Sequence, residues 1–288
     1  MIQDFTYLKP GNVKEALAML ADHEDCKIVC GGQSLLIPMR QGLLVVEYLM
    51  DIKGLNELSY IKYDAKEGLK LGATTTHRMI EKSDVIKKHY PVLAEMEDRL
   101  ASTQTRNWGT IGGNLAHGDA AGDPAPVLIT LNAQVKVASA KGERVVPLET
   151  FYTDIFETVM EHEEMIVEIQ VPPMPAKTGA AYTKFNLLQN DMGVVGVAAS
   201  IAVDGTGTCK NAIIALGNAA ITPIRAKNAE KVLVGKKLTD KLFEEAGEAA
   251  AQECDPVSDI HSSDEFRRHL VKVLTKRMAK KAFEQASK

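Results

Sequence analysis

Residues 108–123 read Trp108-Gly109-Thr110-Ile111-Gly112-Gly113-Asn114-Leu115-Ala116-His117-Gly118-Asp119-Ala120-Ala121-Gly122-Asp123, and this stretch decides the fold. Glycine recurs in it, and neither Lys nor Arg occurs. Glycine tolerates a positive φ and has no side chain to block close approach. Successive backbone amides in such a turn form a nest that binds anions. An ordinary glycine-rich loop is the alternative interpretation.

A second glycine pair lies earlier in the chain, in Val29-Cys30-Gly31-Gly32-Gln33-Ser34. It follows Lys27-Ile28-Val29, which reads as a strand, and precedes Leu35-Leu36, which begin a helix. A strand, a glycine turn and a helix start are the usual context of a phosphate-binding turn. The spacing matches neither the P-loop nor the Rossmann fingerprint. Two amide nests suit a ligand with two adjacent phosphates, such as a dinucleotide with its pyrophosphate between the loops.

Composition places the chain among globular proteins. Its 288 residues predict about two domains, and its residues are 45% hydrophobic and 25% charged. A formal net charge of −4 without a long basic run argues against nucleic acid as the main partner. No apolar stretch approaches the length of a membrane span, and the N-terminus lacks the pattern of a secretory signal. The four cysteines show no C-x-x-C spacing, which excludes a local zinc or iron–sulfur site and predicts a cytoplasmic location.

The first half of the chain alternates helical and extended patterns. We expect a helix after the capping box of Asn12 and Glu15, and a hairpin around residues 64–68. A longer helix is expected from Pro91 to about Ser102. The run Thr74-Thr75-Thr76-His77 lines a ligand pocket in one interpretation, and Thr75 or Thr76 caps a helix in the other.

Asp123 has two interpretations of equal weight. Followed by Pro124, it fits the N-cap of a helix that runs to about Leu131. Its carboxylate is also placed to contact ligand hydroxyls if residues 108–123 surround a ligand. The sequence leaves both open.

A proline cluster, Pro172-Pro173-Met174-Pro175, marks the expected domain boundary, because three prolines in four residues cannot continue a strand or a helix. Beyond it, residues 182–187, 194–203 and 209–216 read as three strands, and the rest as helices.

The two glycine segments together resemble a known family. Cys30-Gly31-Gly32-Gln33-Ser34-Leu35-Leu36 and Arg106-Asn107-Trp108-Gly109-Thr110-Ile111-Gly112-Gly113-Asn114 are similar to the two signatures of the FAD-binding medium subunit of molybdenum hydroxylases. This is the family of carbon monoxide dehydrogenase and xanthine dehydrogenase. The resemblance covers essentially the whole chain. The sequence departs from the family pattern at Cys30 and at Trp108, and it lacks an arginine soon after Lys184.

The resemblance implies an α+β fold. Residues 1–175 would form a two-part FAD-binding domain of the vanillyl-alcohol-oxidase (PCMH) type, subdivided near residue 55. Residues 176–288 would form a smaller domain of the CO dehydrogenase flavoprotein type, with a three-stranded antiparallel sheet and helices.

The same resemblance assigns cofactor-binding residues, and no catalytic or metal-binding ones. Both loops would hold the pyrophosphate, Asp123 would lie beside the ribityl chain, Leu100 or Ala101 and Ile166 would be apolar flavin contacts, and Lys184 would lie near the flavin ring. With Thr76 from the threonine run, the predicted set is Val29, Cys30, Gly31, Gly32, Gln33, Ser34, Leu35, Thr76, Ala101, Thr110, Ile111, Gly112, Gly113, Asn114, Asp123, Ile166 and Lys184.

Histidines and carboxylates are scattered without triad or metal spacing, so the chemistry is expected to reside in cofactors. The resemblance implies an oxidoreductase subunit that carries FAD. A large partner subunit would hold molybdopterin and a small one would hold 2Fe-2S clusters, in a dimer of heterotrimers. Electrons would pass from these clusters through FAD to an external acceptor. The alternatives are a self-sufficient FAD oxidoreductase of related fold and a flavin-free nucleotide-binding assembly module.

Overall fold

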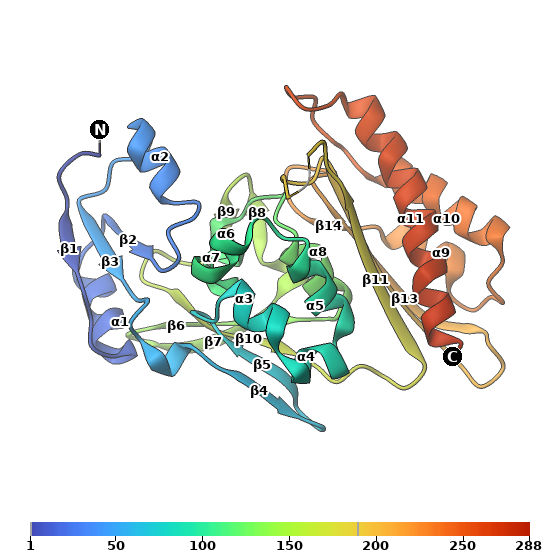
Figure 1. Cartoon of the computed structure of the whole chain (residues 1–288), viewed down its shortest axis with the longest axis horizontal. Helices are drawn as coiled ribbons and strands as arrows, with labels where there is room; N and C mark the ends of the chain where they lie inside the picture. Colours follow the sequence, from blue (N-terminus) through green and yellow to red (C-terminus); the bar gives the residue numbers. More distant parts are fainter. Residues whose placement is uncertain (1, 189) are drawn as a thin grey trace.

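The computed structural model describes residues 2–188 and 190–288. The chain runs through three sheet-containing parts in sequence order, from the N-terminal part at the left of Figure 1 to a C-terminal helical layer at the right. Among the described residues, no helix is both long enough and apolar enough to span a bilayer.

The N-terminal part is a small parallel sheet with the strand order β1-β3-β2. Helix α1 is capped by Asn12, whose side chain accepts a hydrogen bond from the amide of Glu15, as the sequence predicts. Because the strands are parallel, their carboxyl ends share one edge, and the first glycine loop leaves β2 at that edge. The elements are β1 (Thr6–Leu8), α1 (Val13–Asp22), β2 (Cys26–Val29), α2 (Leu36–Gln41) and β3 (Tyr48–Asp51).

The second part is a five-stranded antiparallel sheet, ordered β4-β5-β10-β6-β7, that is packed against a group of short helices. Its elements are η1 (Asn56–Leu58), β4 (Ile61–Asp64), β5 (Gly68–Gly72), α3 (His77–Lys82), α4 (Asp84–His89), α5 (Pro91–Asp98), α6 (Thr103–Trp108), α7 (Ile111–His117), α8 (Pro124–Thr130), β6 (Gln134–Ser139), β7 (Gly142–Pro147), η2 (Leu148–Thr150), β8 (Tyr152–Asp154), β9 (Glu157–Thr158) and β10 (Met165–Val171). The hairpin predicted around residues 64–68 joins β4 to β5.

Two helix predictions in this part need correction. The helix expected to reach Ser102 ends at Asp98, and Ala101 just beyond it has a φ of 43°, which is incompatible with a continuing helix. The glycine-rich stretch after Trp108 is not a loop throughout, because residues 111–117 form helix α7. Packing against the sheet outweighs the low helix propensity of its two glycines.

The C-terminal part is a four-stranded antiparallel sheet, β11-β12-β13-β14, rather than the three strands expected. The additional strand, β14, has two residues. Every residue of β12 is buried, because α5 and α8 lie on one side of the sheet and α9 to α11 on the other (Figure 1). The elements are β11 (Thr178–Phe185), β12 (Val195–Val203), β13 (Cys209–Gly217), β14 (Ile224–Arg225), α9 (Lys227–Leu233), α10 (Asp240–Glu253) and α11 (Asp264–Ala286).

A buried ion network fixes the helices next to the second glycine segment. Glu81 is 3% exposed and lies 2.6 to 2.8 Å from Arg78, Lys82 and Arg106. Arg106 also donates to the carbonyls of Leu100 and Ala101, which holds the left-handed turn in place. Burial opposes ionisation of Glu81, but the hydrogen bonds from these cations lower its pKa to about 2.

We predict that Glu81→Gln destabilises the protein at neutral pH by about 3 kcal/mol, since Arg106 is left buried without its counter-ion. The folded-state pKa lies below the unfolded one, so this contribution is complete at pH 7 and is lost as the pH falls from about 4.5 towards 2. Thermal unfolding of the wild type and of Glu81→Gln between pH 7 and pH 3 should show that the stability difference between them decreases as the pH falls. Glu67→Gln is the control, because Glu67 forms an exposed ion pair with Lys70, and it should change the thermal stability little. A stability difference that stays constant with pH would show that the ionised carboxylate of Glu81 is not the source of the stabilisation.

Candidate functional site

The first glycine loop presents a row of unpartnered backbone amides. Within the described residues, the amides of positions 31 to 35 donate no hydrogen bond to the protein. They follow one another at the carboxyl end of β2, where ligands bind in open α/β sheets. Gly32 has a φ of 68°, a left-handed conformation that few other residues adopt without strain. An anion nest requires free amides of this kind, and anion binding by this loop stays a prediction.

The two glycine segments are in direct backbone contact. A Cβ at Gly31 would lie 2.4 Å from the carbonyl oxygen of Trp108, and a Cβ at Gly109 would lie 3.0 Å from the ring of His77. Cys30 adjoins the same contact, since it directly precedes Gly31 in the chain, and burial raises the pKa of its thiol. The loop after β2 therefore lies against the start of the second segment.

The second segment uses its amides differently from the prediction. Ile111 donates to the carbonyl of Thr75 and Gly112 to that of Ala73, both at 3.0 Å. Gly113 donates to the hydroxyl of Thr110, the N-cap of α7. The interpretation of this segment as a second free nest is therefore wrong. Gly112 is required for packing instead, because a Cβ there would lie 2.7 Å from Ala73. Contact between these residues and a cofactor stays a prediction.

Asp123 joins the second part of the fold to the C-terminal sheet. Its carboxylate accepts hydrogen bonds of 2.6 Å from the hydroxyl of Tyr182 and from Nζ of Lys184. Its side chain is 7% exposed and that of Lys184 is 5% exposed, so this ion pair is buried. Burial raises the pKa of Asp123, and the ammonium of Lys184 opposes that rise. Of the two roles left open for Asp123, the helix cap is excluded, because its side chain makes no capping hydrogen bond.

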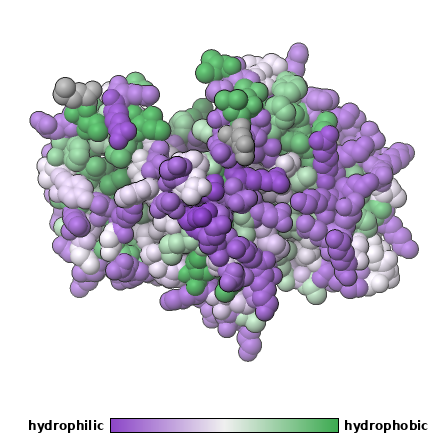
Figure 2. All heavy atoms as spheres, in the orientation of Figure 1, coloured by the Kyte–Doolittle hydropathy of each residue, from purple (hydrophilic) through white to green (hydrophobic). Residues whose placement is uncertain are grey.

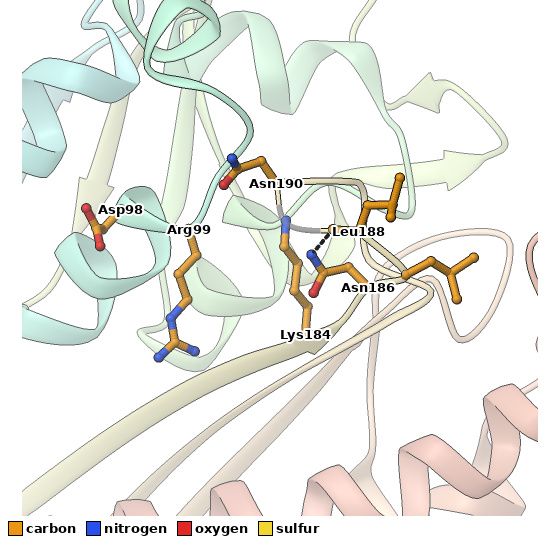
Figure 3. A pocket seen from close by; sticks show the side chains of 7 residues that line it. Asp98, Arg99, Lys184, Asn186, Leu188 and Asn190 are labelled. Atoms are coloured by element: carbon orange, nitrogen blue, oxygen red, sulfur yellow. Dashed lines mark hydrogen bonds between the residues drawn. The ribbon is translucent and has the colours of Figure 1, made fainter.

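A pocket of about 390 Å³ opens beside Lys184. Figure 3 shows Arg99 and Asp98 on one side and Asn186, Leu188 and Asn190 on the other. Its lining is mainly polar. The pocket lies between the end of α5 and the end of β11 with the segment after it, so two separate stretches of the chain enclose it.

The surface above this region is hollowed. Figure 2 shows a notch in the upper edge of the molecule, between the N-terminal part around α2 and the loops at the end of β11. Hydrophobic residues gather on both sides of it in an otherwise hydrophilic view. The large exposed ones in these two segments are Ile37, Leu43, Leu187, Leu188 and Met192.

The remaining predicted residues lie around the same loops. Thr76 caps α3 through its side chain, and its backbone pairs with Thr110. Ile166 is 4% exposed and belongs to the main core, at a bulge in β10 under α7. Ala101 is half-buried in the turn held by Arg106. The other members of the set lie in the two glycine segments themselves, Val29 and Leu35 at the ends of the first and Asn114 within α7.

The sequence did not reveal two features of this region. His77 and Glu97 form a buried pair, with Nδ1 of the ring 2.9 and 3.1 Å from the two carboxylate oxygens. Burial raises the pKa of Glu97. Lys53, which follows β3, lies with Nζ 3.0 Å from the centroid of the Trp108 ring. Both pairs join distant positions, and no local motif marks either.

Comparison with known families agrees with this geometry. The family described as FAD binding domain in molybdopterin dehydrogenase matches residues 3–174. The chain belongs to that family. The CO dehydrogenase flavoprotein C-terminal domain family matches residues 180–282. The fold class and the resemblance inferred from the two glycine segments are thus confirmed.

Relatives of this medium-subunit family match along nearly their whole length. The 6-hydroxypseudooxynicotine dehydrogenase complex subunit alpha of Paenarthrobacter nicotinovorans is 34% identical, with 98% of this chain and 95% of that protein covered. The structure of carbon monoxide dehydrogenase from Hydrogenophaga pseudoflava matches with a TM-score of 0.96 at 33% identity, and 99% of each chain is covered. Quinoline 2-oxidoreductase from Pseudomonas putida 86 matches with a TM-score of 0.94 at 32% identity, and 100% of each chain is covered. These relatives are dehydrogenase and oxidoreductase subunits, and this chain is an oxidoreductase subunit of the same family.

We predict that Asp123→Asn and Lys184→Met each destabilise the protein by about 3 kcal/mol, because each leaves a buried partner unpaired. The double variant should cost less than the sum of the two, by about 2 kcal/mol. Urea unfolding of the four proteins measures this coupling. Tyr182→Phe is the control, since it removes one hydrogen bond and keeps the ion pair. Additive effects of the two substitutions would show that the pair is not coupled.

Proposed function

We propose that this chain is the FAD-carrying electron-transfer subunit of a molybdenum-containing hydroxylase or dehydrogenase. The observation that carries the proposal is the row of free amides after β2, locked by Gly31 against the second glycine segment. Such amides hold a diphosphate without a basic side chain in either loop. Membership of a family described by FAD binding supports the identity of the ligand.

The residues present fit this cofactor, which when bound would supply the ability to accept and donate electrons. The amides of residues 31–35 would hold the pyrophosphate. Asp123 would contact the polar chain between the phosphates and the ring, and Lys184 would lie near the ring at the mouth of the polar pocket. Asp123 and Lys184 form a buried ion pair, so the site offers a fixed electrostatic environment.

The chain's own titratable groups at the site are already paired. Asp123 is bound to Lys184 and Tyr182, and His77 to Glu97. This leaves neither carboxylate as a general base for a substrate. We infer that substrate oxidation occurs on a partner subunit with molybdopterin, and that a small subunit with 2Fe-2S clusters delivers electrons to this chain. An external acceptor would then receive them.

The proposed assembly is a dimer of heterotrimers in the cytoplasm. The first-named relative is by its printed name a subunit of a dehydrogenase complex, which supports a multi-subunit arrangement. The hydrophobic residues on both sides of the notch would be available to such partners.

Purification from the native cells tests the proposal. We expect flavin bands, iron–sulfur absorbance and two further polypeptides in the preparation, because the three subunits would act as one electron-transfer unit. The chain alone, supplied with FAD and a dye acceptor, should not oxidise the complex's substrate. Turnover by the chain alone would instead support a self-sufficient FAD oxidoreductase, and a colourless preparation would support a flavin-free module.

We also predict that Gly31→Ala weakens FAD binding at least tenfold, because the new Cβ would meet the carbonyl of Trp108 and push the two segments apart. Gly54→Ala is the matched control, since a Cβ there meets nothing within 4 Å. Flavin content after gel filtration, together with the melting temperature, separates loss of binding from loss of folding. Full flavin content in Gly31→Ala would contradict the assignment of this loop.

A further inference from the structure

Arg106 is a buried cation, 6% exposed, that binds a carboxylate and a backbone turn at once. Its Nε donates to Glu81 at 2.8 Å, and its Nη1 donates to the carbonyls of Leu100 and Ala101 at 2.7 and 2.9 Å. A planar guanidinium has the fixed donor geometry for such a set of acceptors, and a lysine ammonium has not. Arg106 therefore holds the turn of residues 99–101 from inside the protein.

This turn has a conformation that its sequence disfavours. Ala101 has a φ of 43°, in the left-handed region, where the Cβ of an L-residue lies too close to the following carbonyl oxygen. Glycine is the residue that adopts such a conformation without steric cost. A strained residue of another type persists only where its surroundings determine it, and such residues cluster at functional sites. The hydrogen bonds from Arg106 supply this constraint.

The residues on the N-terminal side of the turn line the polar pocket beside Lys184. Asp98 ends α5 and Arg99 follows it, and both belong to the lining (Figure 3). Burial and the carboxylate of Asp123 raise the pKa of Tyr182, and the guanidinium of Arg99 opposes that rise, so its charge acts on the hydroxyl that binds Asp123. A movement of the turn would therefore move one wall of the pocket.

The residues on the C-terminal side of the turn lead to the first glycine loop. Ser102 caps α6, and its hydroxyl accepts a hydrogen bond from the amide of Thr105. Helix α6 ends at Trp108, whose carbonyl oxygen would lie 2.4 Å from a Cβ at Gly31. One short helix thus joins the turn to the glycine contact, and the side chain of Arg106 reaches back from this helix to the turn.

We propose that Arg106 is a positioning residue for the flavin end of the cofactor, which acts by holding the left-handed turn at Ala101 and with it the pocket wall at Arg99. This inference rests on the proposed function, and it names a residue whose guanidinium is occupied by the protein itself. The loop proposed for the diphosphate, residues 31–35, is a separate segment. Loss of the turn should therefore change the surroundings of the flavin ring more than it changes retention of the cofactor.

Arg106→Lys tests this role, because lysine keeps a positive charge beside Glu81 but lacks the geometry to hold both carbonyls. Hydrogen exchange of the flavin-free full-length chain, resolved to single amides, reports on the turn, since the amides of Arg99 and Leu100 donate within it. We expect these two amides to exchange about tenfold faster or more. In the FAD-loaded chain we expect a changed visible absorption spectrum with the flavin content retained.

Arg78→Lys is the matched control. Arg78 binds the same carboxylate of Glu81 at 2.6 Å, but it is partly exposed and lies on α3 rather than on α6. It should alter neither the exchange of the two amides nor the flavin spectrum. An Arg106→Lys spectrum that differs from the wild type no more than that of Arg78→Lys would overturn the proposal.

Substitutions at Ala101 separate positioning from general stability. Ala101→Val opposes the left-handed turn and should change the flavin spectrum as Arg106→Lys does. Ala101→Gly adopts the turn freely, so in the Arg106→Lys background it should restore slow exchange and the wild-type spectrum. If Ala101→Val does not fold, this rescue decides alone. A double variant as altered as Arg106→Lys would show that Arg106 only stabilises the fold, and would overturn the proposal.

The flavin content of the wild type distinguishes failure of this inference from failure of the proposed function. A wild-type chain that retains FAD, with an unchanged spectrum in Arg106→Lys, would reject the role of Arg106 alone. A wild-type chain that binds no FAD would reject the proposed function, and with it the role of Arg106 toward a flavin, whatever the exchange of the turn.

Discussion

The contact between Gly31 and the carbonyl of Trp108 is the constraint on which the rest of the site depends. A single added carbon at position 31 would lie 2.4 Å from that oxygen, well inside van der Waals contact. Gly112 makes a similar approach to Ala73. The absence of a side chain at Gly31 therefore lets two segments about eighty residues apart pack backbone to backbone. This contact with the second segment fixes the direction of the free amides in the first.

The two glycine segments differ in how their backbone amides are hydrogen-bonded. The first leaves its amides free and so keeps its capacity to bind an anion. The second uses its amides on Thr75, Ala73 and the cap Thr110, and becomes a short rigid helix. Similar composition thus leaves the backbone amides free in one segment and occupied in the other, and hydrogen-bond partners rather than glycine content distinguish them.

Short sequence patterns predicted the elements whose structure depends on interactions between residues close together in the chain. The cap at Asn12, the hairpin before β5 and the strand that leads into Gly31 follow from short-range signals, and the family followed from two motifs. Helix α7 was missed because tertiary packing outweighs the low propensity of its glycines. The role of Asp123 was left undecided because its partners, Tyr182 and Lys184, lie about sixty residues further along the chain.

The buried pair of Asp123 and Lys184 also sets an order of events during synthesis. Lys184 leaves the ribosome 61 residues after Asp123, and β11 needs β12 beside it to form a sheet. Until that sheet docks, the carboxylate of Asp123 has no counter-charge and the pocket beside it has no second wall. A ligand that contacts both sides would consequently bind only after the C-terminal part has folded.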